Sequence, residues 1–549
     1  RGKDYKFTVE ITSSGNSAKV TYGSSTDSEN PPSEEAFVPQ TDGSWNEEKK
    51  VNSPELFEGM TAIYWDNEGT EHELTEASSE EEWNQWYDYN GQGDGQNKWA
   101  NAVTKDSSGN ITGYWVWIPR YAYKIESGLF TSTAGTISVK FLQGTTDKDE
   151  TGATISREYS YTIDDTNEVN NHMNDYVVHP AFRDGTSNNF MLGEWDEEVS
   201  GFWVAKYEAG YQTNTITDNG GVLSTTISNS GDEVVYSDLK YTSYNSSYTT
   251  NALGQDLSST GYSNQNLSYP MFLPLTYSYN NICIGDSYVL SQEIDTANNF
   301  YGLSSSTTDS HQMKNSEWGA VVYLTQSSYG RNETEVTIND YYTNEYTESP
   351  YRTAVTGLAS SDSSESATTD IGKVSAYNTE TGNKGSSTGN ITGIYDLSGG
   401  LWERISGYIL NGNANLTSNG TNSTYGSSGS LIGANLETNP NGYQSLSTRS
   451  YTVYPYNSLS DTYTNNYNTY KGLLSSMYGY GDAILEISTG ANSTISWNSD
   501  YAYFADTTDP FFIRSGTYSR DSDAGSFAFH RTYGFAFCDD GFRTILISE

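Results

Sequence analysis

The chain has 549 residues, and its 70 acidic and 28 basic side chains give a formal net charge of −42. DNA, RNA and anionic membrane surfaces are bound through Lys and Arg, so we expect neither nucleic acid nor an anionic membrane as a partner. Aromatic residues make up 14% of the chain, whereas disordered chains contain few, which indicates a folded protein rich in strands and loops.

The sequence has no run of about 18 apolar residues, so we expect no membrane insertion. Because it begins at Arg1 rather than Met, we expect an upstream segment with an export signal or an anchor, and an extracellular or cell-surface location. Two cysteines, Cys283 and Cys538, are too few for a disulfide framework. Neither they nor the five His have the spacing of a metal site, so we expect no metal centre.

The first 56 residues predict a small hairpin and a linker. Phe7, Val9 and Ile11 alternate with polar residues, and a Ser-Ser-Gly-Asn turn then leads into a second alternating run. Residues 1–22 therefore predict a β-hairpin. Residues 23–56 are rich in Pro, Ser and Glu and show little periodicity, which is typical of a linker.

Residues 57–169 predict a small β-rich module. Residues 62–65 and 71–74 flank Asp-Asn-Glu-Gly, which is a hairpin pattern. Ser79, followed by three Glu, predicts the start of a short helix, because Ser caps helices and acids favour their N-terminal end. Residues 114–121 are strongly apolar and predict a buried strand that ends at Pro119.

Residues 170–549 predict a larger domain with two helices and long polar loops. Residues 201–212 have the pattern of a second strong strand. Helices are expected at about 278–290 and about 316–329, the second with amphipathic spacing and with Asn315 or Ser316 as its N-cap. Most of the rest is rich in Ser, Thr, Asn, Gly and Tyr, which indicates loops.

Five motifs occur in one order within this larger domain: GFWVAKYEAG (201–210), YPMFLPLTYSYNNIC (269–283), MKNSEWGAVVYL (313–324), GIYDLSGGLWER (393–404), and FIRSGTY to GFRTIL (512–546). Together they resemble the formylglycine-generating enzyme, or sulfatase-modifying factor, family. The resemblance implies a C-type-lectin-like fold, with two short helices packed on small twisted sheets. We therefore expect an α+β protein in which a C-type-lectin-like domain with long irregular loops, at 170–549, follows small β-rich N-terminal modules.

Several residues of these motifs are expected to stabilise the fold rather than to react. Trp318 and Trp402 bring large apolar side chains to the core, and Glu317 and Glu403 beside them are expected to accept loop N–H groups. Arg543 can hold carbonyls or a carboxylate with its forked guanidinium. The expected structural residues are Trp203, Glu208, Glu317, Trp318, Asp396, Trp402, Glu403, Arg514, Gly541 and Arg543.

The catalytic residues of the family are not matched. Its oxidases use a cysteine pair to bind copper and activate oxygen, and the motif at 514–518 places Arg520 and Gly525 at those two positions. Soft thiolates select Cu(I), and neither residue provides one. The iron-binding branch of the family uses an H-x-x-x-H-x-E cluster, which is also missing. We therefore expect no enzyme activity, no catalytic residue and no cofactor.

Two further features of the family leave alternatives open. Its members carry calcium near a Gly-Asn-Val-Trp-Glu segment; here Gly400 replaces the Asn, so Glu403 either binds calcium with backbone carbonyls or caps a turn. In this fold the helix with Cys283 packs near the terminal segment with Cys538. The two cysteines therefore form a disulfide, remain separate buried thiols, or provide a nucleophile.

Because we expect no catalysis, the composition of the loops favours a role in ligand binding. Binding residues concentrate on loops carried by a stable scaffold, and loops rich in Tyr, Ser, Asn, Gly and Asp resemble antibody paratopes. Residues 519–532 lie where the active site of the family, or the variable face of its diversity-generating members, would be. The expected ligand contacts are Tyr518, Arg520, Asp521, Asp523, His530, Arg531 and Tyr533. The alternative for His530 and Arg531 is pairing with local acids.

The sequence thus predicts a non-catalytic binding or adhesion protein, extracellular or displayed on a bacterial or phage surface, with a host, cell-surface or polymer ligand. Residues 115–125, followed by 179–182 and 201–210, resemble surface and phage-associated proteins of Gram-positive bacteria. The alternatives are a subunit of an extracellular filament or pilus, in which the strand at 7–11 completes a neighbour's sheet; a phage receptor-binding protein; and a copper-dependent oxidase of the formylglycine-generating type.

Overall fold

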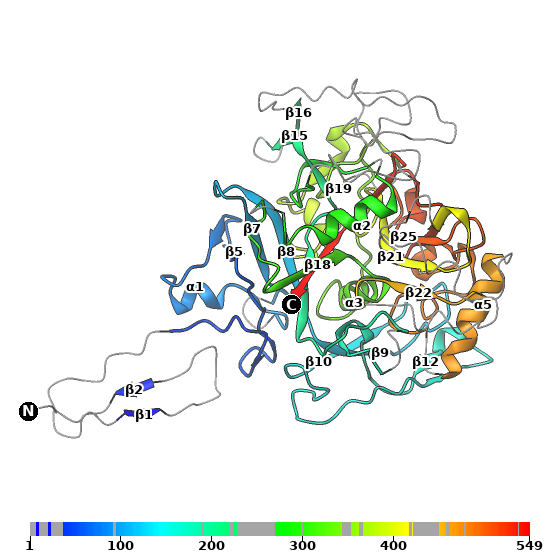
Figure 1. The fold of residues 1–549 in the computed structure, drawn as a ribbon, viewed down its shortest axis with the longest axis horizontal. Helices are drawn as coiled ribbons and strands as arrows, with labels where there is room; N and C mark the ends of the chain where they lie inside the picture. Colours follow the sequence, from blue (N-terminus) through cyan, green and yellow to red (C-terminus); the bar gives the residue numbers. More distant parts are fainter. Residues whose placement is uncertain are drawn as a thin grey trace, which may run out of the picture.

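The computed structural model describes residues 7–9, 20–22, 37–91, 95–187, 191–218, 223–227, 269–280, 282–297, 300–342, 353–361, 366–416, 420, 449–456, 462–476, 479–535 and 537–549. The fold is α+β, as expected, with two seven-stranded sheets, several smaller sheets and a few short helices (Figure 1). None of the helices described is long and apolar enough to cross a membrane.

The first seven-stranded sheet joins segments that the sequence assigned to different modules. In spatial order its strands are β18 (Thr308–Gln312), β28 (Thr544–Ser548), β14 (Gly201–Ala205), β8 (Ile111–Pro119), β7 (Asn101–Lys105), β5 (Met60–Trp65) and β6 (Glu71–Glu73). All neighbours are antiparallel, which confirms the hairpin of β5 and β6. Because β14 lies between β8 and β28, residues 57–169 and 170–549 share one sheet and one hydrophobic core.

The second seven-stranded sheet is built from residues 402–542. Its strands are β22 (Thr452–Tyr454), β21 (Trp402–Ile409), β25 (Phe511–Arg514), β26 (Phe529–Thr532), β24 (Tyr501–Tyr503) and β23 (Asn492–Thr494), with β27 (Asp540–Phe542) also paired to β21. Parallel pairs join β21 to β22 and β27, and β24 to β26. This sheet places two strands from the last 50 residues, β25 and β27, beside β21.

Smaller sheets surround these two. Two three-stranded sheets contain β10 (Ile137–Phe141), β9 (Tyr121–Ile125) and β13 (Val177–Val178), and β16 (Leu223–Ile227), β15 (Gly210–Asp218) and β17 (Thr276–Ser278). Two-stranded sheets pair β1 (Phe7–Val9) with β2 (Val20–Tyr22), β3 (Trp45–Asn46) with β4 (Val51–Asn52), β11 (Tyr161–Thr162) with β12 (His172–Met173), and β19 (Leu358–Ser360) with β20 (Val374–Ala376). The antiparallel pairing of β1 with β2 confirms the N-terminal hairpin.

The helices of the described chain are α1 (Glu80–Asn84), α2 (Ile284–Gln292), α3 (Asn315–Gln326) and α5 (Tyr463–Gly472). Ser79 caps α1 in a reciprocal bond pair with Glu82, which confirms the predicted helix start. Helix α2 begins later than expected because residues 276–278 form β17. Every residue of α3 is buried, since this helix lies inside the molecule (Figure 1).

Gly319 lets a loop approach α3 closely. A Cβ atom at this position would lie 2.1 Å from the carbonyl oxygen of Gly481, so any side chain would push the 481–486 loop away. The glycine inside an otherwise regular helix is therefore explained by packing.

Part of the expected linker packs onto the rest of the protein. Residues 37–56 contain β3 and β4, and Val51 is fully buried in the main core. The Asn52 side-chain amide donates to the carbonyl oxygens of Gly144 and Ser200, at 3.0 and 2.9 Å. These contacts hold the segment against residues from both sides of the expected boundary at 169.

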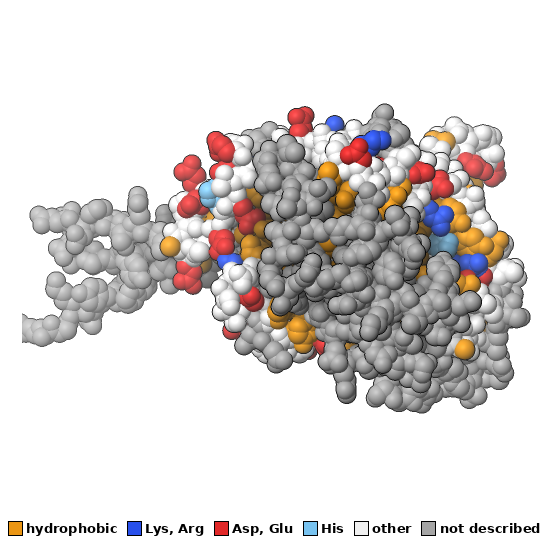
Figure 2. Space-filling model, turned by 90° about the horizontal axis from the view of Figure 1, so that it is seen from above, with side chains coloured by type: hydrophobic (Ala, Val, Ile, Leu, Met, Phe, Trp, Pro, Cys, Tyr) orange, Lys and Arg blue, Asp and Glu red, His pale blue; other side chains and the backbone are white. Residues whose placement is uncertain are grey.

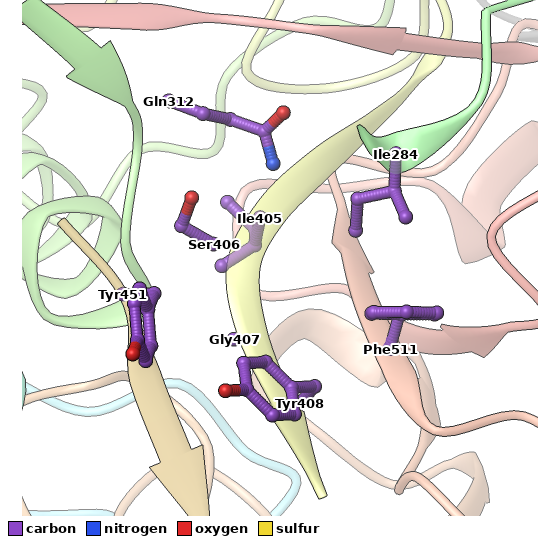
Figure 3. Close-up of a pocket in the computed structure, with 8 residues that line it drawn as sticks. All are labelled: Ile284, Gln312, Ile405, Ser406, Gly407, Tyr408, Tyr451 and Phe511. Carbon is purple, nitrogen blue, oxygen red and sulfur yellow. The ribbon is translucent and has the colours of Figure 1, made fainter. Parts of the chain in front are cut away.

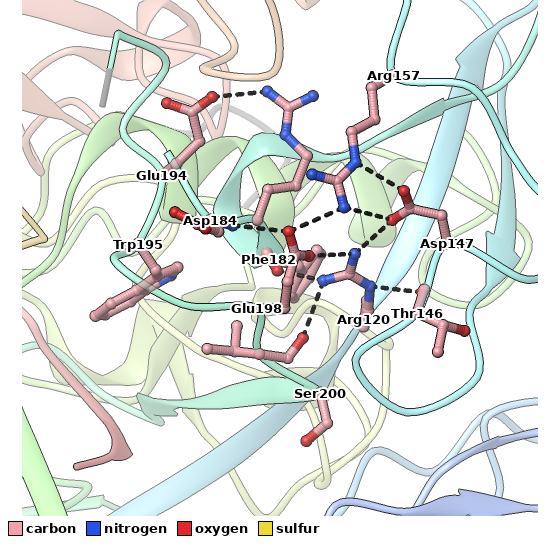
Figure 4. Close-up of polar contacts among 12 residues, drawn as sticks. Arg120, Thr146, Asp147, Arg157, Phe182, Asp184, Glu194, Trp195, Glu198 and Ser200 are labelled. Atoms are coloured by element: carbon pink, nitrogen blue, oxygen red, sulfur yellow. Dashed lines mark hydrogen bonds and ion pairs between the residues drawn. The ribbon is translucent and has the colours of Figure 1, made fainter. Parts of the chain in front are cut away.

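The buried guanidinium of Arg120 also connects residues from both sides of the expected boundary at 169 (Figure 4). Arg120 is fully buried and donates to the carbonyl oxygen of Thr146 at 2.9 Å, while its Nη2 lies 2.7 Å from both Asp147 and Glu198. Arg157 joins the same two carboxylates, at 2.7 and 2.9 Å. Two arginines and two acids thus tie the loop at 142–157 to the irregular segment that leads into β14.

All ten residues expected to be structural are buried. Glu317 accepts the backbone N–H of Lys314 at 2.7 Å, and the Trp318 indole donates to the carbonyl oxygen of Ser526 at 2.8 Å. Glu403 differs from the expectation, because it accepts the Arg543 guanidinium at 2.6 and 2.8 Å rather than a loop N–H. A charge of this kind is stable inside a protein only when it is paired.

The 481–486 loop carries a buried acid surrounded by tyrosines. Glu486 accepts hydroxyl groups from Tyr123 at 2.8 Å and Tyr323 at 2.7 Å, and the backbone N–H of Gly481 at 2.6 Å. Burial raises the pKa of Glu486 to about 7, although these three donors lower it. The loop therefore holds a carboxyl group that takes up a proton on folding near neutral pH.

We expect Glu486→Gln to flatten the pH dependence of stability between pH 5 and 8. A carboxyl pKa raised on folding stabilises the folded state at low pH, and this stabilisation is lost as the pH rises from the unfolded pKa through about 7. The full loss is about 3 kcal/mol by linkage. The melting temperature, measured from pH 5 to 8, tests this, with Glu168→Gln as the exposed control. A variant with the slope of the unmodified chain would contradict the assignment.

Candidate functional site

Aromatic and basic side chains gather on the outer side of the second seven-stranded sheet. We call this surface the aromatic–basic face; its residues are Trp402, Tyr463, Tyr501, Tyr503, Arg520, His530 and Arg531. All except Trp402 are half-buried, so their side chains are partly accessible. The space-filling view in Figure 2 shows hydrophobic and basic side chains gathered around a histidine near the right-hand end of the molecule.

The alternation of β24 places two tyrosines on this face. Ala502 is fully buried, so its neighbours Tyr501 and Tyr503 point to the opposite side of the strand. β24 pairs with β26 at Ala502 and Phe529, and His530 follows next along β26. Strand pairing therefore brings residues that are far apart in the sequence into one aromatic group.

His530 lies at the centre of the face. Its ring centroid is 5.4 Å from Tyr501, with an interplanar angle of 22°, and 5.4 and 5.3 Å from Trp402 and Tyr503. Its Nδ1 lies 2.5 Å from the carbonyl oxygen of Arg531, so Nδ1 carries the proton and donates. Stacking of this kind fixes the ring positions before any ligand arrives.

The two arginines of the face differ in their partners. Arg531 lies 4.1 Å from the Tyr503 ring and forms ion pairs with Asp506 and, at 3.3 Å, with Asp509. The guanidinium of Arg520 lies 4.6 Å from the Tyr501 ring and 5.8 Å from Trp402, and no carboxylate among the described residues lies within ion-pair distance of it. Arg520 is therefore the basic group of this face that remains able to pair with an incoming anion.

The other predicted contacts lie around the face. The prediction that Tyr518 is an exposed contact is wrong. Tyr518 is buried, because its ring stacks on that of Tyr342 at 4.9 Å between centroids. Asp521 is exposed and Asp523 half-buried in the short turn at 521–523. Tyr533 is 40% exposed and stacks on Phe535 at 5.5 Å. Arg520, His530 and Arg531 are thus the predicted contacts that the structure brings together.

Four residues of the face were not among the predicted contacts. Trp402 was expected to be structural, and it is buried beneath His530 while also facing Arg520. Tyr463, Tyr501 and Tyr503 were missed. The Tyr-Ala-Tyr alternation at 501–503 is a strand signal with one side aromatic, and it could have indicated two of them.

The geometry at the positions of the family's cysteine pair gives no reactive group. Arg520 belongs to the face, and a Cβ atom at Gly525 would lie 2.0 Å from the Asp500 carboxylate, so any side chain there would displace that carboxylate. Cys283 and Cys538 are both thiols, so the disulfide alternative is not formed. Burial raises the pKa of Cys283 well above its usual range, which keeps it protonated beside Asp286.

In the segment where the resemblance implies calcium, the acceptor oxygens already bind protein donors. Both carboxylate oxygens of Glu403 accept from Arg543, and the carbonyl oxygen of Gly400 accepts the N–H of Tyr518 at 2.9 Å. These residues do not fit the calcium site that the resemblance implies. Across the described ranges, no group of three or more His, Cys, Asp or Glu is arranged to hold a metal ion.

A small cavity lies between α2 and β21 (Figure 3). Ile284, Ile405 and Phe511 form its apolar wall, and Gln312 and Ser406 contribute polar groups. Its volume of about 10 Å³ accommodates no more than one water molecule. The cavity is therefore a packing feature rather than a ligand site.

No protein-family model and no curated protein matches the chain. The resemblance to the formylglycine-generating enzyme family therefore stays a prediction from the five motifs.

We expect His530→Gln to reduce the loss of stability at acid pH. Burial, with a smaller effect of Arg520, lowers the pKa of His530 to about 4. The unfolded chain therefore binds a proton that the folded chain rejects, and stability is lost as the pH falls from about 6.5 towards 4. Glutamine keeps an amide that can donate to the Arg531 carbonyl but does not titrate.

The measurement is the melting temperature between pH 4.5 and 7.5, with His72→Gln as the control because His72 is not on the face. The melting temperature of the variant should fall less on acidification than that of the unmodified chain. Equal losses would show that His530 is not held neutral by its stacked neighbours.

Proposed function

We propose that the chain is a non-catalytic binding protein, extracellular or displayed on a cell surface, which uses the aromatic–basic face to bind an anionic saccharide polymer. The scaffold we propose is the C-type-lectin-like fold implied by the five motifs, with the face at the position of the family's active site. The observation that carries the proposal is Arg520, stacked on Tyr501 beside His530, with no carboxylate of the described residues within ion-pair distance of its guanidinium.

The chemistry of the face supports a ligand with both rings and negative charge. Half-exposed aromatic rings offer flat apolar area at low entropic cost, and sugar rings have apolar faces that stack on them. A guanidinium held flat against a ring presents its donors in a fixed plane, which suits a carboxylate or a sulfate. A neutral His530 adds an acceptor at Nε2 for a hydroxyl group.

The overall charge selects among anionic polymers. Nucleic acids carry a charge on every nucleotide and are bound through many cations, whereas this chain has a net charge of −42. A polymer with one carboxylate per sugar or fewer places a single charge at Arg520 and neutral rings on the tyrosines. This distribution fits two basic groups among seven residues.

Binding to immobilised polygalacturonate, hyaluronate and chondroitin sulfate tests the proposal, with dextran as the neutral polymer. We expect the unmodified chain to bind at least one acidic polymer more tightly than dextran. Arg520→Ala and Tyr501→Ala should each weaken this binding about tenfold or more, as loss of a charge-assisted bond or a stacked ring does. The affinity of Arg520→Lys should lie between those of the unmodified chain and Arg520→Ala, because lysine keeps the charge but loses the planar stacking on the ring.

Lys148→Ala is the matched control, since Lys148 is an exposed cation on the loop at 142–157, and it should bind within twofold of the unmodified chain. Melting temperatures of all variants show whether they fold. Equal binding by Arg520→Ala, or no acidic polymer bound above dextran, would overturn the proposed function.

A filament subunit is the second candidate, and one observation favours it. β1 and β2 pair only with each other among the described strands, so each has an open edge that could add to the sheet of a neighbouring copy. Sedimentation of the full chain over a hundredfold concentration range tests this: growth into large assemblies supports a filament, and a constant monomer mass contradicts it.

A further inference from the structure

A second site lies at the edge of the small β10–β9–β13 sheet, outside the aromatic–basic face. A polar pocket of about 220 Å³ opens between β10 and the loop that follows α3. Its walls include Ser138, Tyr176, Ser328, Tyr329, Asn332 and Glu333. Hydroxyl, amide and carboxylate groups therefore surround a space large enough for one sugar ring.

The floor of the pocket is an unpaired strand edge. β10 pairs with β9 alone, and the backbone N–H of Glu126 bonds to the carbonyl of Thr136 while that of Leu142 bonds to Arg120. In an antiparallel pair, residues alternate between facing the partner strand and facing away. These two bonds fix the alternation, so the N–H and C=O groups of Ile137 and Val139 point away from β9 and into the pocket.

The outward backbone groups of β10 have no partner among the described residues. Ile137 is 2% and Val139 7% exposed, and in the part of the chain that the structure describes no donor or acceptor pairs with the outward groups of either residue. Backbone amides in folded proteins are almost always hydrogen-bonded to protein, water or ligand, so an N–H and C=O pair left open by the protein at a pocket floor is available to a ligand. An amide group matches such a pair, because it supplies one acceptor and one donor.

The pocket walls are held in place by strained backbone and by packed rings. Asn332 and Glu333 are consecutive non-glycine residues in the left-handed region, with φ of 49° and 68°. Their N–H groups bond to Ser327 and Gln326, and Glu333 accepts the Thr136 hydroxyl at 2.7 Å. The Tyr329 ring packs on Phe141 at 4.7 Å. Strain of this kind persists where the surroundings enforce it, and such residues cluster at ligand sites.

We propose that this pocket binds a hexose unit that carries an acetamido group. The acetamido group pairs with the open backbone edge at Ile137 and Val139, the sugar ring lies against Tyr176 and Tyr329, and Glu333 and Asn332 accept from and donate to its hydroxyls. An extended peptide also pairs with a strand edge, but it needs a groove along several residues, whereas this space is limited to about 220 Å³ between β10 and the 327–333 loop.

Titration of the full chain with N-acetylglucosamine, followed by saturation-transfer NMR and by hydrogen exchange of the 136–141 segment, tests the proposal. We expect saturable binding, slower exchange in that segment, and at least tenfold weaker binding of glucose, which has the same ring without the acetamido group. Glu333→Ala and Tyr176→Ala should each weaken binding fivefold or more.

Glu168→Ala, an exposed acid on a neighbouring surface loop, is the control and should bind as the unmodified chain does. Arg520→Ala should also bind N-acetylglucosamine normally, so failure of the proposed function leaves this result unaffected. Equal binding of glucose, no change in exchange at 136–141, or tighter binding of an N-acetylated dipeptide amide than of the sugar would overturn the proposal.

Discussion

The Arg543 guanidinium joins the two large sheets, and most of the fold depends on how its charge is buried. Its Nη1 donates to the carbonyl oxygen of Ala205 on β14, in the first sheet, at 2.6 Å, while Nε and Nη2 hold Glu403 on β21, in the second. Nη2 also donates to the carbonyl oxygen of Tyr395 at 2.8 Å. Removing one partner from such a buried pair typically costs about 3 to 5 kcal/mol, because the other charge is left without compensation.

Around this pair the protein buries more acid than base. Glu208 and Asp396 lie in the same region, and burial together with neighbouring carboxylates raises the pKa of Glu208 well above its usual range. Glu208 therefore favours its protonated form more strongly than an exposed glutamate does, and it accepts the N–H of Leu401 at 3.2 Å. Glu486 is likewise a buried carboxyl group with a raised pKa, and tyrosine hydroxyls surround it. A chain rich in acids can thus keep a dry core by leaving some acids uncharged.

The parts of the fold that could be predicted are those that local sequence determines. Ser79 caps α1, the apolar run before Pro119 is β8, and Trp318 lies in a buried helix, because propensity and periodicity act within a few residues. The parts that could not be predicted depend on pairing across long separations. Tyr518 is buried by Tyr342, which lies in a distant loop, and Tyr501 joins the face only because β24 pairs with β26. The grouping of Arg520, His530 and Arg531 on one face could be predicted because these residues lie close together in the sequence.

The two proposed sites differ in how the net charge of the chain affects them. A ligand without charge approaches the β10 pocket with no long-range opposition, whereas an acidic polymer is repelled by a protein with a net charge of −42. Salt screens that repulsion beyond about 8 Å at physiological ionic strength, but it affects a guanidinium in direct contact much less. Arg520 therefore acts only at short range, after screening has let the polymer approach, and the rings of Tyr501 and Tyr503 supply apolar contact that salt does not weaken. An anionic ligand on this surface is held by a few close contacts rather than by attraction to the whole molecule.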